Sequence, residues 1–173
     1  LVRYLQSYPD GEFSSDANYY LGVMADEKGN KDEALGYFRK VIDAGNAKFM
    51  ENALLYAAQA EYDKGNYQQA LADYAKLANT SRNAANRQEG LMGLVRTHMK
   101  LENYNEAVRA AADLLGSAAL SPEMATEARY LRGKAYQQLK EVDKAMADFQ
   151  AIAKDTRSVY GAEAQFILAD TYF

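Results

Sequence analysis

The chain has 173 residues, of which 49% are hydrophobic and 25% charged, and this balance excludes an intrinsically disordered protein. Its formal net charge of −4 argues against a nucleic-acid-binding surface, because such surfaces carry an excess of lysine and arginine. The lack of cysteine excludes disulfides, a thiol catalyst and thiolate metal sites, and no apolar run reaches membrane-spanning length.

The first residues, 1–9, are predicted to be the end of a helix, which a proline and a glycine then break. A helix follows from about residue 15 to 28, with Ser14 or Ser15 as its N-cap and Asp16 at its positive end. The apolar stripe of this helix includes Ala17, Tyr20, Leu21 and Met24. Because the chain begins with leucine rather than methionine, we interpret it as a fragment of a longer protein.

The next helix belongs to a unit that the chain repeats four times. In the copy at residues 66–78, apolar residues follow Tyr67 at offsets 3, 4, 7, 10 and 11, which is the spacing of an amphipathic helix. The copies share a small residue, and these residues are 36, 37 and 38 positions apart: Ala34, Ala70, Ala107 and Ala145. A period of this length indicates stacked supersecondary units.

Each repeated helix follows another predicted helix, at about residues 15–28, 48–64, 83–101, from 121 and from 158. The pairs are separated by Gly29-Asn30, Gly65-Asn66, Glu102-Asn103 and Lys140-Glu141. We expect the glycines to adopt the left-handed conformation and the asparagines to cap the second helix of each pair. Turns this short force antiparallel hairpins. The chain therefore has ten predicted helical segments, and it has no strand signal.

Small and aromatic residues recur at matching places in these hairpins. In chain order they are Leu21-Gly22, Ala34 and Phe38; Ala58, Ala70 and Tyr74; Val95, His98, Ala107 and Ala111; Gly133, Tyr136, Ala145 and Phe149; Leu168, Ala169 and Tyr172. This pattern resembles the tetratricopeptide repeat, although Ala25 stands where a large residue is usual and the period exceeds the usual ~34 residues.

The resemblance implies an all-α fold, a right-handed α-α superhelix of antiparallel helix hairpins that forms a single solenoid over residues 1–173. Its expected parts are residues 1–9 (a remnant second helix), 15–46, 47–81, 82–118 and 121–156 (repeats one to four), and 158–173 (the first helix of a fifth repeat). We expect Gly22 to face Ala34, and Gly133 to face Ala145, where the helices cross. The aromatic residue then fills the groove toward the next repeat.

A weaker resemblance concerns the loops. The segment 8–22 is similar to junctions in bacterial envelope repeat proteins of the outer-membrane assembly lipoprotein and Tol-Pal coordinator type. Phe13 with Ala17 has the same spacing as Phe49 with Ala53 and as Tyr160 with Ala164. This resemblance favours a periplasmic or outer-membrane-associated location over a cytoplasmic one.

No residue set for catalysis, a cofactor or a metal ion emerges from the sequence. His98 is the single histidine, and we interpret it as a packing residue because no nucleophile or ligand set accompanies it. The acidic pairs Asp26-Glu27 and Asp32-Glu33 lie at predicted helix ends, and we interpret them as solvated or dipole-complementing charges rather than as acid/base pairs. We therefore predict that the protein is not an enzyme.

The resemblance places a partner-binding surface on the concave face, which the first helices line. The corresponding residues are Tyr19, Val23, Asp26, Leu55, Gln59, Tyr62, Met92, Arg96, Met99, Tyr130, Lys134, Gln137 and Phe166. Exposed aromatic and methionine side chains would suit a peptide or protein partner, whereas some of these residues would instead pack between helices. The clamp of chaperone-binding relatives needs a lysine and an asparagine where this chain has Tyr19 and Val23, so that activity is not expected.

Two functions are consistent with the sequence. The first is a non-enzymatic protein-interaction scaffold, with no nucleic acid as partner and no membrane insertion by this segment. The alternative is an architectural spacer or self-assembly module within a larger bacterial envelope protein. The apolar stripe of the last helix, Ala164, Ile167, Leu168 and Tyr172, is expected to face water and to support self-association.

Overall fold

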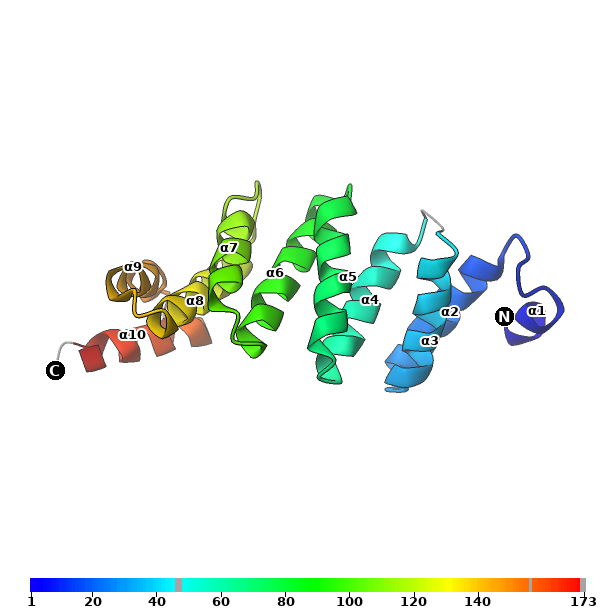
Figure 1. The fold of residues 1–173 in the computed structure, drawn as a ribbon, viewed down its shortest axis with the longest axis horizontal. Helices are drawn as coiled ribbons and strands as arrows, with labels where there is room; N and C mark the ends of the chain where they lie inside the picture. The colour runs from blue at the N-terminus through cyan, green and yellow to red at the C-terminus, as the bar shows by residue number, and fades with distance from the viewer. Residues whose placement is uncertain (46–47, 156, 172–173) are drawn as a thin grey trace. The chain divides into compact units, whose positions relative to one another are not determined.

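A computed structural model describes residues 1–45, 48–155 and 157–171 of the chain (Figure 1). The described residues form ten α-helices and no strand, so the predicted all-helical fold is confirmed. The helices are α1 (Val2–Ser7), α2 (Ser14–Glu27), α3 (Lys31–Asp43), α4 (Met50–Asp63), α5 (Tyr67–Thr80), α6 (Ala84–Lys100), α7 (Tyr104–Leu115), α8 (Pro122–Gln138), α9 (Val142–Ile152) and α10 (Val159–Thr171).

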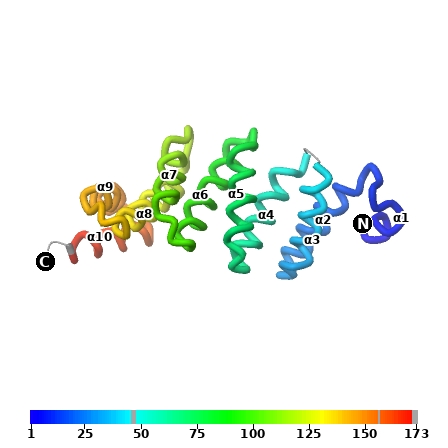
Figure 2. Tube along the Cα trace, viewed as in Figure 1, coloured from blue at the N-terminus to red at the C-terminus, as the bar shows by residue number. Residues whose placement is uncertain are grey.

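The chain forms two compact units, Leu1–Gly90 and Leu91–Phe173. In the first unit α2 packs on α3, α4 packs on α5, and α3 also contacts α4 (Figure 1). In the second unit α7 packs on α8, α8 on α9 and α9 on α10, and these contacts can be followed along the trace in Figure 2. Each unit is therefore a stack of helices in which sequence neighbours pack together, as in a solenoid of hairpins.

The turn inside each hairpin has the same backbone conformation in four places. Residues 29, 65, 102 and 140 have positive φ angles of 80°, 81°, 59° and 61°, although only the first two are glycine. In each turn the next residue's N–H donates to a carbonyl five positions earlier, for example Asn30 N–H to the Ala25 oxygen at 2.9 Å. This is the hydrogen bond of a Schellman motif, and it satisfies a carbonyl that the helix end leaves open.

The predicted helix caps are only partly correct. Asn30, Asn66 and Asn103 occupy N-cap positions, but none of them makes a side-chain cap hydrogen bond. Ser14 is already inside α2, whose N-cap is Phe13, so the predicted serine cap is wrong there. At the start of α8, Ser121 accepts a hydrogen bond from the Met124 N–H at 3.2 Å, with proline at the first helical position.

In two hairpins, a glycine of the first helix faces an aromatic ring of the second helix rather than an alanine. A Cβ atom built on Gly22 would lie 2.7 Å from the ring of Phe38, and one on Gly133 would lie 2.7 Å from the ring of Phe149. The expectation that these glycines face Ala34 and Ala145 is therefore corrected: the missing side chain makes room for the ring of the same hairpin. The far side of the Phe38 ring stacks on Tyr56 of α4, with centroids 4.9 Å apart and 6° between planes.

The buried side of α2 also differs from the predicted stripe. Ala17, Asn18, Gly22 and Ala25 are buried, whereas Tyr20 and Met24 are 49% and 46% exposed. Because α2 carries apolar residues on several sides, its periodicity does not identify one face, and the glycine–ring contact decides the orientation instead.

The predicted water-facing stripe of α10 is likewise corrected. Ala164 is fully buried, and Ile167 and Leu168 are half-buried against the core cluster formed by α8 and α9. Tyr172, the last member of that stripe, lies outside the described residues. The exposed apolar residues of the described part of α10 are Val159 and Phe166.

Candidate functional site

The predicted partner-binding residues form three columns on the first helices, which are α2, α4, α6, α8 and α10. The columns follow the small residues Ala17, Ala53, Gly90, Ala128 and Ala164 at offsets of two, six and nine. The first column is Tyr19, Leu55, Met92, Tyr130 and Phe166; the second is Val23, Gln59, Arg96 and Lys134; the third is Asp26, Tyr62, Met99 and Gln137.

The first column packs between helices. Tyr19 stacks on Phe49, which precedes α4, with ring centroids 4.4 Å apart. The ring of Tyr130 lies 4.9 Å from that of Tyr160 at the start of α10, which is the corresponding contact in the second unit. Burial, followed by a hydrogen bond with Glu163, raises the pKa of Tyr130 far above its usual value.

The other residues of the first column differ in their exposure to solvent. Met92 is fully buried in the core cluster of the second unit, and Tyr130 is also buried, so neither offers an exposed side chain to a partner. Leu55 is half-buried. Phe166 is 72% exposed. The recurring Phe/Tyr-x-x-x-Ala spacing at helix starts thus has a structural explanation, since Phe49 and Tyr160 are the packing partners of this column.

The second column remains partly open to solvent. Gln59 is exposed, donates to the Asp63 carboxylate at 2.8 Å and accepts from the Tyr74 hydroxyl at 3.2 Å. Val23 and Lys134 are half-buried. Arg96 forms two parallel bonds with Glu127, from Nε at 2.6 Å and from Nη2 at 2.7 Å, a geometry that holds the guanidinium in place.

The third column is also partly open, and its chemistry differs between the units. In the first unit Asp26 pairs with Lys31 at 2.7 Å, and the ring of Tyr62 lies edge-on to Tyr67 with centroids 5.4 Å apart. In the second unit Met99 and Gln137 are half-buried. Together with the second column, the first unit therefore has a valine, an amide, an acid and a tyrosine, and the second has a lysine, an arginine paired with Glu127, an amide and a methionine.

Sequence reasoning missed two buried ion pairs. Arg39 of α3 donates to Asp73 of α5 at 2.8 and 2.6 Å and to Glu61 of α4 at 3.1 Å. Arg132 of α8 donates to Asp148 of α9 at 2.8 and 2.6 Å. Each aspartate directly precedes the aromatic residue of its repeat. An acidic residue next to a core position is the feature of the sequence that could have predicted these ion pairs.

A carboxylate also fastens the loop between α5 and α6. Glu51 accepts hydrogen bonds from the Ser81 hydroxyl, from the Arg82 N–H at 2.9 Å and from the Asn86 amide at 2.9 Å. These bonds, that of Ser81 first, lower the pKa of Glu51 to about 2. The Glu51 charge positions this loop and the start of α6, because Ser81 and Arg82 belong to the connecting segment and Asn86 lies in the first turn of α6.

The groups with catalytic potential are few. His98 is half-buried, and burial lowers its pKa while Glu106 acts in the opposite direction. Across residues 1–45, 48–155 and 157–171, no three histidine or acidic side chains come together as a metal site would require. Within the same ranges, no helix has both the length and the apolar character needed to cross a membrane.

Comparison with known proteins agrees with the helix-hairpin geometry. A family model described as "Tetratricopeptide repeat" matches residues 2–48 and 92–160, and a second model with that description matches residues 52–83. A search of curated proteins finds no match. Neither family model separates the envelope lipoprotein or Tol-Pal coordinator type from other members, so the envelope setting stays a prediction.

Among solved structures, the chain is similar to a tetratricopeptide repeat protein from Parabacteroides merdae, with a TM-score of 0.74 and 22% identity. The similarity covers 89% of this chain and 58% of that one, so the present chain spans little more than half of its relative's length. At this identity the likeness concerns the fold. The family models together with the repeated hairpins decide the assignment: the chain belongs to the tetratricopeptide repeat family.

Proposed function

We propose that the chain is a non-enzymatic scaffold that binds a peptide or protein segment through the second and third columns of its first helices. The supporting observation is the contrast between columns. Two of the five residues in the first column, Met92 and Tyr130, are buried, whereas all eight residues of the other two columns keep some exposure to solvent. Repeat families of this kind commonly use such extended surfaces for protein recognition.

The chemistry of the two columns favours a partner segment of mixed character. Met99 and Tyr62 offer adaptable apolar contacts, while Lys134 and Arg96 supply positive charge in the second unit. We therefore expect the segment that meets the second unit to carry acidic residues near apolar ones. The other exposed residues of the first helices then determine how the bound segment is aligned along them rather than how tightly it binds.

A peptide-library selection against the intact chain tests this proposal. Tyr62→Ser and Lys134→Glu should each weaken the binding of selected peptides by about tenfold, which corresponds to the loss of about 1.4 kcal/mol. Tyr37→Ser and Lys76→Glu are matched controls on second helices, with a half-buried tyrosine and an exposed lysine. Equal loss in the controls, or no loss in the first-helix variants, contradicts the assignment.

The alternative is a spacer whose surface binds nothing and whose role is to hold flanking segments apart. The observation that favours it is the tie from Arg39 to Asp73 and Glu61, which stiffens the first unit across three helices. A library selection that yields no peptide dependent on Tyr62 or Lys134 would favour the spacer. Self-association would show separately, as a molar mass in light scattering that rises with concentration and falls on Phe166→Ser.

A further inference from the structure

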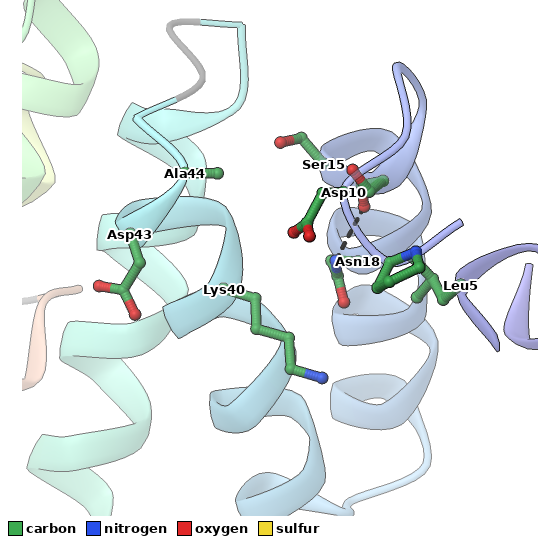
Figure 3. Close-up of a pocket in the computed structure, with 9 residues that line it drawn as sticks. Leu5, Asp10, Ser15, Asn18, Lys40, Asp43 and Ala44 are labelled. Carbon is green, nitrogen blue, oxygen red and sulfur yellow. Dashed lines mark hydrogen bonds between the residues drawn. The ribbon is translucent and has the colours of Figure 1, made fainter. Parts of the chain in front are cut away.

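A polar pocket of about 410 Å³ lies in the first unit, away from the three columns. It is lined by the segment that joins α1 to α2, the first turns of α2 and the end of α3. Figure 3 shows the Asp10 carboxylate between α2 and α3, with Asn18 on α2 and the Lys40 side chain reaching from α3 toward α2. The pocket is open enough to admit the end of a side chain or a small molecule.

Asn18 provides a buried acceptor that the protein leaves unsatisfied. Only 6% of this residue is exposed. Its amide nitrogen donates to the Ser14 carbonyl oxygen at 2.8 Å, and this bond fixes which way the amide is turned, because a carbonyl can only accept. The other amide atom, Oδ1, has no hydrogen-bond partner within the described residues. A group that enters the pocket and offers an N–H would supply the missing bond.

Comparison among the hairpins indicates that the fold does not require asparagine at this place. The residue that follows the small residue of the first helix is Asn18 in α2, Leu54 in α4, Leu91 in α6, Arg129 in α8 and Gln165 in α10. Leu54 is fully buried, and Leu91 packs against a core cluster. A leucine would therefore satisfy the packing of α2 without burying an unpaired amide oxygen, and the presence of asparagine calls for another explanation.

The charges around Asn18 indicate what kind of group fits. Asp10 and Asp43 both line the pocket, and neither forms an ion pair within the described part of the chain. The Lys40 ammonium lies 5.6 Å from the ring centroid of Tyr37 on its own helix. The pocket thus has three acceptors, two carboxylates and one amide oxygen, against one cation, the Lys40 ammonium.

We propose that this pocket binds an organic cation that carries N–H donors, as in a lysine ammonium, a protein N-terminus or an arginine guanidinium. The ligand donates to Asn18 Oδ1, and its positive charge lies toward Asp10, whose carboxylate lies between α2 and α3 (Figure 3). This site shares no lining residue with the three columns and does not depend on the peptide-binding function proposed above. Lys40 opposes the cation, so it tunes affinity downward rather than providing it.

The test uses three probes on the intact chain: n-butylammonium, methylguanidinium and glycinamide, which represent lysine, arginine and an N-terminus. Saturable shifts of the Asn18 side-chain amide in nuclear magnetic resonance spectra at constant ionic strength are expected for at least one probe. The tightest of the three identifies the source. Tetramethylammonium, which has the charge but no N–H donor, should bind at least about tenfold more weakly.

Two variants decide whether the pocket carries the binding. Asn18→Leu copies the residue of α4 and α6, so it should fold, and it should weaken probe binding at least about tenfold, followed on backbone amides of α2. Asn105→Leu, at an exposed position of α7, should leave binding unchanged. Lys40→Gln should leave binding equal or tighter.

The contrary outcomes are equally specific. Unchanged binding in Asn18→Leu, or equal binding of tetramethylammonium, would mean that the cations are attracted by charge alone, without a hydrogen bond to Asn18. Either result would overturn the proposal. Loss of binding in Lys40→Gln together with shifts caused by acetate would make the pocket an anion site instead. No shift with any of the three cations also overturns it.

Discussion

The hairpins α2/α3 and α8/α9, one in each unit, share the same glycine–ring contact and turn, and they differ at the neighbouring positions. Both place a glycine against the aromatic ring of the second helix, and both turn through a residue with positive φ. One residue before the glycine and one before the ring, α2/α3 has Leu21 and Tyr37, whereas α8/α9 has the ion pair Arg132–Asp148.

The ends of the two hairpins differ as well. Where α2/α3 has Asn18 and Asp43, α8/α9 has Arg129 and Lys154, which line a corresponding pocket of about 370 Å³. The central contacts of a hairpin are therefore set by the repeat, while its end varies in charge from repeat to repeat. Specificity can change there without loss of the fold, because the positions concerned do not hold the two helices together.

The largest expected effect comes from transferring the apolar pair into the second hairpin. Arg132→Leu leaves Asp148 buried without its cation, and removing one partner of a buried pair typically costs about 3–5 kcal/mol in the free energy of unfolding. The double variant Arg132→Leu/Asp148→Tyr, which copies Leu21 and Tyr37, should recover most of that loss. Urea unfolding of both variants measures this, and a double variant as unstable as the single one would refute the equivalence.

The glycine–ring contact is expected to have the next largest effect. Gly22→Ala places a methyl group 2.7 Å from the Phe38 ring, which also stacks on Tyr56, so it should destabilise the chain by about 1–3 kcal/mol. Gly36→Ala is the matched control, because its Cβ would meet nothing within 4 Å, and it should stabilise by about 0.5–1 kcal/mol. Thermal unfolding that moves the two variants in the same direction would contradict this packing.

The hairpin α4/α5 extends the comparison, since Glu51 occupies the position that Ser15 has in α2 and Thr126 has in α8. The pKa of Glu51 falls from 4.5 to about 2 on folding, so its stabilisation is complete above pH 4.5 and is lost as the pH falls toward 2. Glu51→Gln should therefore cost about 1 kcal/mol at neutral pH, after allowance for solvent screening, and much less near pH 2. Unfolding curves of the variant and the unchanged chain across this pH range provide the check. A difference in stability that does not vary with pH would contradict a stabilising role for the Glu51 charge.

The smallest expected effect concerns the turns. Lys140 adopts φ 61° and its counterpart Gly29 adopts φ 80°. A side chain in the left-handed region is strained, so Lys140→Gly should stabilise by about 0.5–1 kcal/mol net of the added freedom of the unfolded chain, and Gly29→Lys should do the reverse. Differential scanning calorimetry of the two variants tests this, and opposite shifts in Tm are the expected result.

Much of the fold could be predicted because the same sequence pattern occurs in four repeats. The small residues Ala34, Ala70, Ala107 and Ala145 are all buried, and the period that connects them predicts hairpins without knowledge of any single helix. The orientation of α2 could not be predicted from its own sequence, because apolar residues lie on several of its sides. Tyr20 and Met24 were therefore assigned to the core, yet they are exposed.

The candidate surface was harder to predict than the fold. The family register correctly identifies positions on first helices, but exposure depends on the neighbouring hairpin, which a residue's own helix does not reveal. Tyr19 and Tyr130 are covered by Phe49 and Tyr160, each about thirty residues further along the chain. The same limit applies to Arg39, whose main partner Asp73 is 34 residues away.

The tie made by Arg39 also affects how the first unit responds to force. One guanidinium on α3 holds carboxylates on both α4 and α5, with bonds of 3.1 Å to Glu61 and 2.6 Å to Asp73. If the chain is stretched along the stack, tension that would peel α3 away from the next hairpin must break these bonds together rather than one after another. Two hairpins joined in this way would yield in a single step under load, and the spring constant of the unit would be set by one arginine.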